Sequence, residues 1–264
     1  MVKKLVLFDK IYNIDLQQRK ESIYSRYIKY LNEFTKGFLK TTIKINKLRN
    51  FDHRFEISVE GPEELFIFNI LKKEIGTIIE FRDVEINKVY KGTMVEVGKV
   101  GFGIFVDCAI LNPKIDVLVN LHTLRNQLCN GKERSLREII DAYDFIDHFP
   151  IYIKITYIDK DNNKLQGELA SETLSLFKKV LDENIEGLFL SGETKGQFKK
   201  ALIKRGHLRD IISVIRYGFL ENIVLLKQGS NAAGIIAHIG NQFKNCKFSA
   251  LRPKRIKKLL LKNN

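Results

Sequence analysis

The sequence predicts an α+β protein in which two βαββαβ ferredoxin-like units flank a central five-stranded OB barrel. Both ends of the chain show the order strand, helix, strand, strand, helix, strand, which is the split motif of ferredoxin-like folds. Between them lie five short β-rich runs with a helical stretch between the third and the fourth, which is the element order of an OB barrel. These patterns predict three domains, at residues 1–86, 87–182 and 183–264.

The first unit is predicted from apolar periodicity and turn residues. Its four strands are expected at residues 3–8, 38–48, 53–60 and 77–81. Residues 15–36 carry apolar side chains at spacings of three and four, which predicts a helix after the first strand. Gly61 and Pro62, followed by two glutamates, begin a second helix, because proline and acidic side chains favour the first helical turn. Gly76 ends that helix.

The last unit repeats this order. Its strands are expected at residues 187–192, 210–218, 221–229 and 247–251. Thr194 is the predicted N-cap of a helix that runs through Arg205. Ser230 or Asn231 caps a second helix that extends to about Phe243. The repeat is one of pattern and not of sequence, so it predicts a fold and no activity.

The central region is β-rich. Its strands are expected at residues 91–100, 101–108, 115–121, 150–160 and 164–169. The last two flank residues 161–163, a tight-turn sequence. A polar segment, residues 123–147, follows the third strand. Within it, residues 134–146 have helical spacing, with Ser135 as N-cap and Glu138 at the reciprocal position of a capping box.

Three runs in this region carry a resemblance to a known family. They are KGTMVEVGKVGFGIFVDC at residues 91–108, IDVLVNLHTL at 115–124 and IKITYIDKDNNKLQGELA at 153–170. In this order they resemble the S1-type RNA-binding OB domain, with its glycine-led first strand, aromatic–Gly–small–Phe–Val second strand and closing pair joined by an Asp turn. The resemblance implies that single-stranded RNA binds across the second and third strands. Asn120 stands where that family tends to carry histidine, and His122 follows two residues later.

Aromatic and basic side chains near these strands predict an RNA-binding face. It comprises Lys91, Lys99, Phe102, Phe105, Asn120, His122 and Arg125. Exposed rings stack on unpaired bases, and each contributes roughly 1–3 kcal/mol. Phe102 and Phe105 are three residues apart, so on an extended strand they point to opposite faces. We expect Phe102, between two glycines, to be the exposed ring and Phe105 to be core; the alternatives are a packed Phe102 and an ordinary surface histidine at His122.

The excess of positive charge is confined to the end of the chain. The protein has 45 lysines and arginines against 31 acidic residues, a formal net charge of +14. Residues 195–264 contain 16 of the basic residues and two acidic ones, Asp210 and Glu221, so the preceding part is neutral. Such a polarised chain indicates an anionic partner, most commonly nucleic acid, because lysine and arginine displace counterions condensed on phosphates. An anionic membrane and an ordinary solvated face are the alternatives.

The basic residues fall on two predicted helical stretches. The residues expected to contact RNA there are Lys195, Lys199, Lys200, Lys204, Arg205, Arg209, Arg252, Lys254, Arg255, Lys257 and Lys258. Lys200 and Lys204 are neighbours on one helix face, where like charges repel and a phosphate would relieve the repulsion. Residues 251–264 have the pattern of a short basic amphipathic helix. Three interpretations of this stretch are possible: contact with nucleic acid, adhesion to an anionic membrane, and packing of its leucines on the protein. Contact with nucleic acid is preferred to membrane adhesion, because the apolar strip lacks a bulky aromatic anchor.

Motifs for several other functions are missing. Gly229 precedes a helix start, but neither a G-x-x-x-x-G-K-[ST] motif nor Rossmann spacing is present, so a helix cap is preferred to a phosphate loop. Cys108, His122, Cys129 and His148 match no zinc spacing. No catalytic residue, cofactor or metal is expected. No run approaches the roughly 18 apolar residues of a membrane span, and three widely spaced cysteines fit a reducing cytoplasm.

The complete arrangement, including the stretch at residues 204–240, resembles an archaeal protein family of unknown function, which implies the layout and an archaeal source but no activity. We expect a cytoplasmic, non-catalytic accessory protein whose barrel binds single-stranded or looped RNA and whose basic domain binds the phosphate backbone. One alternative is a protein-interaction module that docks on the ribosome, the exosome or RNA polymerase. The other is an RNA-processing enzyme.

Overall fold

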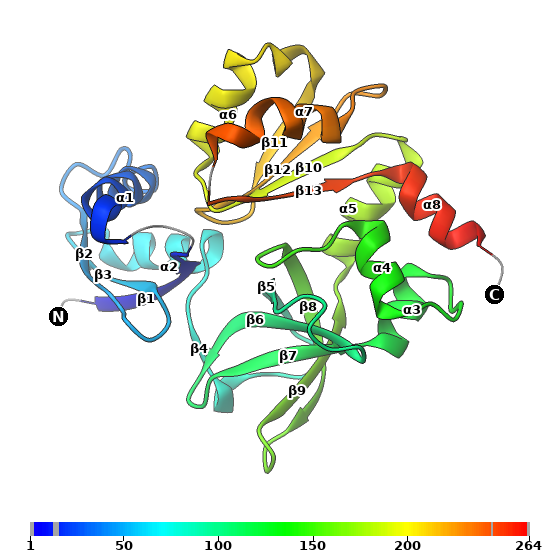
Figure 1. Ribbon diagram of the computed structural model, residues 1–264. Coiled ribbons are helices and arrows are strands. Elements are labelled where there is room, and N and C mark those ends of the chain that lie inside the picture. Colours follow the sequence, from blue (N-terminus) through cyan, green and yellow to red (C-terminus); the bar gives the residue numbers. More distant parts are fainter. Residues whose placement is uncertain (1–2, 13–15, 244, 263–264) are drawn as a thin grey trace. The chain divides into compact units, whose positions relative to one another are not determined.

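The structure, a computed structural model, combines helices with β-sheets, as expected for an α+β protein (Figure 1). It describes residues 3–12, 16–243 and 245–262. Two units are distinguished: one comprises Met1–Ile78 with Gly218–Leu220, and the other comprises Ile79–Tyr217 with Glu221–Asn264. Of the described helices, none is both long and apolar enough to cross a membrane.

The first unit is an antiparallel sheet packed against helices. Its elements are β1 (Lys3–Lys10), α1 (Leu16–Asn32), β2 (Thr42–Leu48), β3 (Arg54–Glu60) and α2 (Glu64–Glu74), with the strand order β1-β3-β2. The ring of Tyr27 stacks on Phe55 with centroids 4.4 Å apart and meets Phe219 edge-on at 4.7 Å. Asp9 is buried, but its carboxylate accepts hydrogen bonds from the Tyr27 hydroxyl and the Phe219 N–H, each at 3.1 Å. These partners offset the cost of burying this polar group. The predicted start of the first helix, residue 15, lies outside the described residues.

The predicted strand at residues 77–81 is divided between two sheets. Thr77 forms an isolated antiparallel bridge with Leu7 of β1. In contrast, β4 (Ile79–Glu80) pairs in parallel with β6 (Gly103–Leu111). This short run therefore contributes one residue to the first sheet and two to the barrel sheet.

The centre of the second unit is a closed five-stranded barrel. Its strands are β5 (Val89–Val95), β6, β7 (Ile115–Asn120), β8 (Pro150–Asp159) and β9 (Lys164–Leu169), and the turn η1 (Phe81–Asp83) precedes them. The strands pair in the order β6-β5-β8-β9-β7, and β7 pairs back on β6. Alternate residues of β8, Ile151, Ile153 and Ile155, fill the interior, because successive strand residues point to opposite faces. The predicted tight turn is confirmed: the Asn162 N–H donates to the Asp159 carboxylate at 3.0 Å.

Helices follow β7 and β9. They are α3 (Leu121–Leu128), α4 (Leu136–Tyr143) and α5 (Ser171–Asp182). The predicted capping box of α4 is confirmed: the Ser135 N–H donates to the Glu138 carboxylate at 2.9 Å, and the Glu138 N–H donates to the Ser135 hydroxyl at 3.3 Å. The third barrel strand ends one residue earlier than predicted, because Asn120 caps α3 and accepts the Thr123 N–H at 2.9 Å.

The C-terminal part of the second unit is an antiparallel sheet. Its elements are β10 (Gly187–Ser191), α6 (Lys195–Lys204), η2 (His207–Asp210), β11 (Ile211–Arg216), β12 (Glu221–Leu226), α7 (Ala232–Ile239), η3 (Gly240–Gln242), β13 (Lys247–Leu251) and α8 (Pro253–Leu261). The strand order is β11-β12-β10-β13. The predicted second helix is shorter than expected, because the 3-10 turn η3 replaces its last turn before Phe243.

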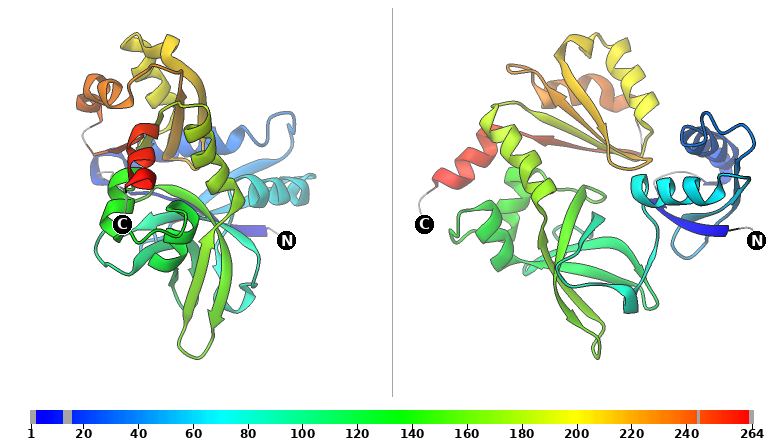
Figure 2. Two further views of the ribbon diagram at one scale, coloured as in Figure 1. Left: turned by 90° about the vertical axis from the view of Figure 1, so that its right-hand side faces the viewer. Right: turned by 180° about the vertical axis from the view of Figure 1, so that it is seen from behind.

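The two faces of this sheet have different neighbours. Leu188 and Leu190 of β10 belong to a core with α6 and α7. Phe189, between them, belongs to the barrel core, where its ring centroid lies 4.9 Å from that of Phe149. The sheet therefore separates α6 and α7 from the barrel, and α5 leads from the barrel to β10 (Figures 1 and 2).

The tail forms α8, which packs on the barrel region. Ile256 and Leu259 are buried in the same core as α4 and α5 side chains. The last carbonyls of a helix lack helical partners. Here Arg134 donates from Nε to the Leu259 carbonyl at 3.3 Å, and Lys132 donates to the Leu260 carbonyl at 2.6 Å. The packing interpretation of the tail is confirmed, and its buried apolar side is not available for membrane adhesion.

Candidate nucleic-acid interface

The loop between β5 and β6 is held in place at both ends. Asp147 accepts the Val97 N–H at 2.9 Å and a hydrogen bond from Lys247 of β13 at 2.7 Å. Burial alone would raise the pKa of Asp147, but these hydrogen bonds bring it below its ordinary value, so the carboxylate stays ionised. At the other end, the Leu121 N–H donates to the Phe102 carbonyl at 2.8 Å. The loop is thereby tied to the C-terminal sheet and to α3.

Phe102 and Phe105 form an aromatic pair where this loop enters β6. Phe102 is 55% exposed, as predicted. The ring centroids lie 6.1 Å apart and the ring planes are 88° from parallel. The prediction that the two rings point to opposite faces of a strand is wrong, because Phe102 precedes β6 and the alternation of strand side chains does not apply to it. The prediction that Phe105 is a core residue is also wrong, because Phe105 is half-buried. Gly103 permits a close approach of the strands, because a Cβ there would lie 2.5 Å from the Val119 carbonyl oxygen.

Phe105 belongs to a row of outward side chains that are in register across the barrel. Val95 of β5 and Leu118 of β7 are its two cross-strand neighbours. Leu118 is paired with Gln166 of β9, and Gln166 is paired with Tyr157 of β8. The Tyr157 side chain is 50% exposed. Three strand spacings, about 15 Å along the surface, therefore separate Phe105 from a further exposed ring.

Tyr157 is a candidate residue that the sequence-based prediction misses. Because Ile153 and Ile155 point inward, strict alternation would direct Tyr157 inward as well. A register shift between Ile155 and Tyr157 turns the tyrosine outward instead. Such a bulge adds one residue to one strand, and the alternation of the sequence does not reveal it.

Three predicted residues lie in or next to α3. Asn120 is occupied as the N-cap. His122 is exposed, and its Nε2 lies 3.1 Å from the Asn126 side-chain nitrogen. Arg125 is half-buried and donates from Nε to the Arg134 carbonyl at 2.7 Å. Asn120 thus has a structural role, whereas His122 is exposed and Arg125 lines a cavity together with Leu121, whose N–H donates to the Phe102 carbonyl.

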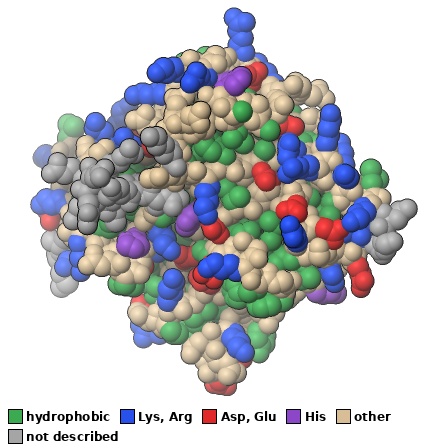
Figure 3. All heavy atoms as spheres, in the orientation of Figure 1, with side chains coloured by type: hydrophobic (Ala, Val, Ile, Leu, Met, Phe, Trp, Pro, Cys, Tyr) green, Lys and Arg blue, Asp and Glu red, His purple; other side chains and the backbone are tan. Residues whose placement is uncertain are grey.

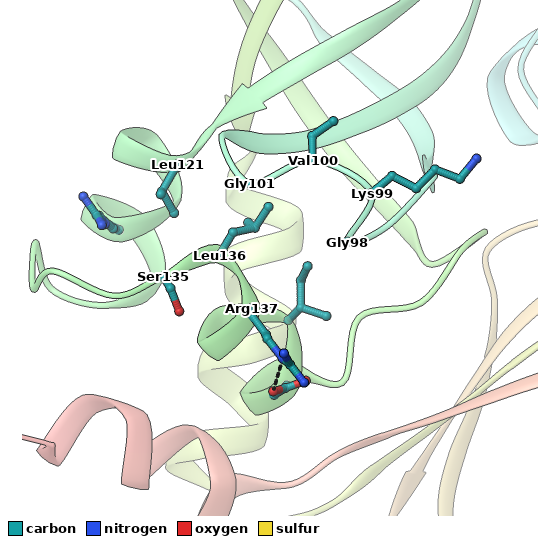
Figure 4. A pocket seen from close by; sticks show the side chains of 11 residues that line it. Gly98, Lys99, Val100, Gly101, Leu121, Ser135, Leu136 and Arg137 are labelled. Atoms are coloured by element: carbon teal, nitrogen blue, oxygen red, sulfur yellow. Dashed lines mark ion pairs between the residues drawn. The ribbon is translucent and has the colours of Figure 1, made fainter.

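A cavity of about 660 Å³ lies between the β5–β6 loop, α3 and α4. Its apolar lining includes Val100, Leu121, Leu136 and Ile140, and its basic lining consists of Lys99, Arg125 and Arg137. Figure 4 shows Leu121 and Leu136 projecting from the helices, and Arg137 turned toward Asp141, 4.0 Å away. This volume is within the range of small-molecule sites, roughly 300–1,000 Å³. An apolar floor beside cations can accept a planar base together with its phosphate.

The two lysines predicted on this face differ in position. Lys99 extends away from the helices in Figure 4 and forms an ion pair with Glu96 at 2.8 Å. The hydrogen bond from Lys99 to Glu96 raises the pKa of the lysine above its ordinary value. Lys91 is half-buried beside Tyr152, about 13 Å along β5 from Val95. Lys99 therefore belongs to the cavity lining in the loop that leads to Phe102, whereas Lys91 lies outside that lining.

The basic residues around α6 form a separate surface. Lys199, Lys200, Lys204, Arg205 and Arg209 are exposed, and Lys195 is half-buried. No carboxylate in the described part of the chain forms an ion pair with the five exposed cations. Figure 3 shows lysine and arginine side chains gathered over α6 and again around α8. Because the sheet separates α6 from the barrel, the α6 cations and Phe102 are not brought together.

One cation of α8, Arg255, contacts a residue of the barrel cavity. Lys254, Lys257 and Lys258 are exposed. Arg255 donates to the Asp141 carbonyl at 3.4 Å, and Asp141 also lines the cavity. Arg252 lies at the N-cap position of α8, where it lines a second cavity.

Cysteines and histidines do not gather into a ligand set. Within the described ranges, no three His, Cys, Asp or Glu side chains cluster as metal ligands. Cys108 and Cys129 are buried. Burial raises the pKa of the Cys129 thiol to about 11, so at neutral pH it stays protonated and unreactive.

Solved structures show low similarity to this chain. An uncharacterized protein from Methanocaldococcus jannaschii is 16% identical, with a TM-score of 0.23, over 34% of this chain and 96% of its own. GSP13 from Bacillus subtilis is 16% identical, with a TM-score of 0.23, over 33% of this chain and 56% of its own. A chain of the a/eIF2alpha–aDim2p–rRNA complex from Pyrococcus horikoshii OT3 is 12% identical, with a TM-score of 0.26, over 47% of this chain and 64% of its own. Scores this low do not establish a common fold. No curated protein matches the chain.

Two family profiles match the regions that build the candidate interface. The profile of the DUF2110 central domain matches residues 84–180, which contain the barrel and α3 to α5. The profile of the DUF2110 C-terminal domain matches residues 186–251, which contain the sheet and α6. Together the matches cover more than half of the chain, which therefore belongs to the DUF2110 family.

Proposed function

We propose that this protein is a non-catalytic RNA-binding protein and that its barrel is an S1-like OB domain. The observation that carries the proposal is the exposed ring of Phe102, which meets Phe105 beside a cavity with an apolar floor and a basic lining. An exposed ring offers its face to an unpaired base, and nearby cations neutralise the adjoining phosphates. The closed barrel and the helices between its third and fourth strands support the OB assignment.

The proposed contacts on the barrel divide into stacking and phosphate groups. Phe102 and Phe105 stack on bases, and Tyr157, on the same outer surface, receives a base farther along the strand. The cations that accompany them are Lys99 and Arg125, with His122 as a further polar contact. Lys91 contacts the RNA only where the strand continues along β5. Asn120 contributes through the second hydrogen of its side-chain nitrogen, because its oxygen caps α3 and the nitrogen already donates to Gln166 at 3.4 Å.

The α6 surface is proposed to bind the phosphate backbone without sequence preference. Its five exposed cations are not neutralised by carboxylates of the described chain, so replacing their counterions with phosphates is favourable. Because the sheet lies between α6 and the barrel, an RNA that uses both surfaces must be folded or extend around the domain. A structured RNA with an unpaired loop has this property, and the proposed role is that of an accessory factor in translation, ribosome assembly, RNA processing or transcription.

The flanking units are proposed to be ferredoxin-like, with domain boundaries after residues 86 and 182. In the C-terminal sheet the order β11-β12-β10-β13, with α6 after the first strand and α7 after the third, supports this assignment. In the first unit the order β1-β3-β2 and the Thr77 bridge to β1 support it. The three free cysteines support the further proposal of a cytoplasmic location.

A second candidate function, docking on a protein partner, is favoured by one observation. Ile203, Leu208 and Ile212 are 45%, 55% and 48% exposed near the edge strand β11. Apolar side chains rimmed by cations are typical of interaction surfaces. A defined complex that survives nuclease treatment and is lost in Leu208→Asp would favour this candidate over RNA binding.

The direct test of the proposed function is fluorescence anisotropy with labelled single-stranded RNA, duplex RNA and single-stranded DNA. We expect the tightest binding for single-stranded or looped RNA, with an affinity that falls steeply as salt is raised. The RNA is recovered after incubation, and its length is expected to be unchanged. Absence of binding at low salt would refute the proposed function, and shortened RNA would refute its non-catalytic character.

A further inference from the structure

A second cavity, of about 560 Å³, lies in the C-terminal part of the chain. It is bounded by the β12–α7 loop, residues 228–231, and by the beginning of α8. Its basic lining consists of Arg252, Lys254 and Arg255. The volume is sufficient for a nucleotide-sized ligand, so the charges that line it decide what it can hold.

The cavity carries more positive than negative charge. Glu186 is the one carboxylate among its lining residues, and one of its oxygens accepts the Ala232 N–H at 2.7 Å. Arg255 is partly engaged by α4, since its Nη1 donates to the Asp141 carbonyl at 3.4 Å and lies 3.9 Å from the Asp144 carboxylate. Three cations against Glu186, with Arg255 shared with Asp144 outside the lining, leave a surplus of about one to two positive charges, to which the start of α8 adds a partial positive charge. A ligand with a charge near −2 would balance it.

Arg252 supplies the most specific observation. Its Nε is buried and has no hydrogen-bond partner among the described residues, although its side chain lines the open space of the cavity. A charged donor that is buried without a partner is costly. The guanidinium fork matches the paired oxygens of a phosphate, so an oxyanion in the cavity would pair with the part of the Arg252 side chain that lines it, and a small rotation of that side chain would bring Nε to the same oxyanion.

The backbone at this cavity also favours a negatively charged ligand. Both α7 and α8 begin at this cavity, and neither has an acidic residue in its own first turn. The N-terminal end of a helix carries partial positive charge and attracts anions. At α7 this potential is already used in part by Glu186 and by the Asn231 cap, so the principal contribution falls to α8 and to Arg252.

We propose that this cavity binds a phosphate monoester, either as a free nucleotide or as the terminal phosphate of an RNA strand. A monoester carries about −1.5 to −2 charges at neutral pH, which matches the surplus in the cavity better than the single charge of an internal phosphodiester. Asn184, Gln228 and Ser230 line the remaining space and can hydrogen-bond to a sugar or a base. The RNA-end form of this inference rests on the proposed function, whereas the free-nucleotide form does not.

The test measures binding of three probes to the full chain: inorganic phosphate and AMP by calorimetry, and matched RNA oligonucleotides with a 5′-phosphate or a 5′-hydroxyl by anisotropy. We expect AMP to bind, or the 5′-phosphorylated RNA to bind more tightly than its 5′-hydroxyl counterpart. The first result identifies a free nucleotide as the source, and the second identifies an RNA end. Absence of both effects overturns the inference.

Variants connect the binding to the cavity. Arg252→Gln is expected to weaken AMP or 5′-phosphate binding at least tenfold, with unchanged affinity for the 5′-hydroxyl RNA. Lys254→Gln, at an exposed position, keeps the test valid if the first variant unfolds, and a loss of about threefold is expected. Arg82→Gln removes the same charge at an exposed position outside the cavity and outside the surfaces assigned to RNA, and serves as the matched control. An equal loss in this control overturns the site. Failure of the proposed function is recognised separately, as lack of binding to the 5′-hydroxyl RNA.

Discussion

Phe102 is the residue on which the proposed RNA contact depends most. Its side chain is 55% exposed, so its removal deprives a base of a stacking surface without opening a cavity in the core. We expect Phe102→Ala to weaken single-stranded RNA binding about tenfold, equivalent to about 1.4 kcal/mol and within the range for one stacked base. The effect persists at high salt, where phosphate contacts have weakened, and is measured by anisotropy.

The control for this variant is Phe51→Ala. Phe51 is also an exposed phenylalanine, 69% accessible, but it belongs to the first unit. It is expected to leave RNA binding unchanged. A sharp fall in the melting temperature of Phe102→Ala, or equal binding losses in both variants, would show that Phe102 is not a stacking platform.

Glu138 gives the chain a predictable response to acid. A hydrogen bond from Lys262, and then those from the backbone and hydroxyl of Ser135, lower the pKa of Glu138 to about 2. The ordinary pKa of glutamate is about 4.3. The ionised form therefore stabilises the folded state fully above that value, and the contribution is lost as the pH falls from about 4.3 through about 2.

We therefore expect Glu138→Gln to lower the free energy of unfolding at pH 7 by about 0.5 kcal/mol, a modest value because the charge is partly exposed at a helix N-terminus. Urea unfolding at pH 7 and at pH 2 measures it, and most of the difference from the wild type should be lost at the lower pH. Glu133→Gln removes the same charge from an exposed position nearby. A deficit of equal size at both pH values would contradict the assigned pKa.

At the residue scale, sequence patterns predict whether a side chain is exposed better than they predict toward which face of a strand it points. The glycines around Phe102 correctly indicate an exposed ring. The direction of Phe105 is predicted wrongly because strand alternation was extended to Phe102, which precedes the strand. Asn120 has the pattern of a strand end, and only the chain reversal into α3 explains it as a helix cap.

At the scale of a secondary-structure element, the helix α6 is expected to bind RNA through its exposed lysines. Lys199, Lys200 and Lys204 are exposed, while Phe198 and Leu202 anchor the helix in the core. Changing the three lysines to glutamate should weaken RNA binding by at least tenfold at moderate salt, because phosphate attraction becomes repulsion. Circular dichroism should show a folded protein.

A matched control for α6 exists in the first unit. Lys36, Lys40 and Lys73 are also exposed, and their change to glutamate alters the net charge by the same amount. This control is expected to retain most of the RNA affinity. Similar losses in the two triple variants would mean that net charge, and not the α6 surface, governs binding.

Most elements follow from periodicity, and the exceptions have physical reasons. In α3 only Leu124 and Leu128 are buried, so its eight residues present too few apolar positions to define a helical period. In α5 the buried residues are Thr173, Leu176, Phe177 and Val180; this helical spacing is readable, although α5 is absent from the elements predicted above. The run at residues 77–81 is divided because its sheet partners are distant in sequence.

At the scale of the whole molecule, the barrel and the C-terminal sheet share a core. Phe189 of β10 has no exposed surface and contacts Phe149 of the barrel region. We expect Phe189→Ala to lower the free energy of unfolding by about 3–5 kcal/mol. Native-state hydrogen exchange should show that amides of β6 and β12 lose protection together.

Loss of protection in the sheet alone would contradict a shared core.

The shared core also limits how the two RNA-binding surfaces can be separated experimentally. Truncation before α6 removes β12, β13 and α8, which bury barrel side chains, so a truncated chain would confuse lost binding with lost folding. Point variants of the full chain avoid this difficulty.

The sequence shows which part of the chain is positively charged, but not where these charges lie in the folded molecule. The count of basic residues identifies a positive C-terminal region. It does not reveal that α6 lies behind a sheet while α8 packs on α4 beside the barrel cavity, because this depends on contacts between residues far apart in the chain.

The most direct test of RNA binding by two distinct surfaces is the salt dependence of affinity for single-stranded RNA in the wild type, Phe102→Ala and the triple variant in which Lys199, Lys200 and Lys204 become glutamine. Each phosphate contact contributes a slope of about −0.7 for single strands. The triple variant should therefore show a slope shallower by about 2, and Phe102→Ala should give a weaker line parallel to that of the wild type. An affinity independent of salt, or no change in either variant, would contradict RNA binding by these two surfaces.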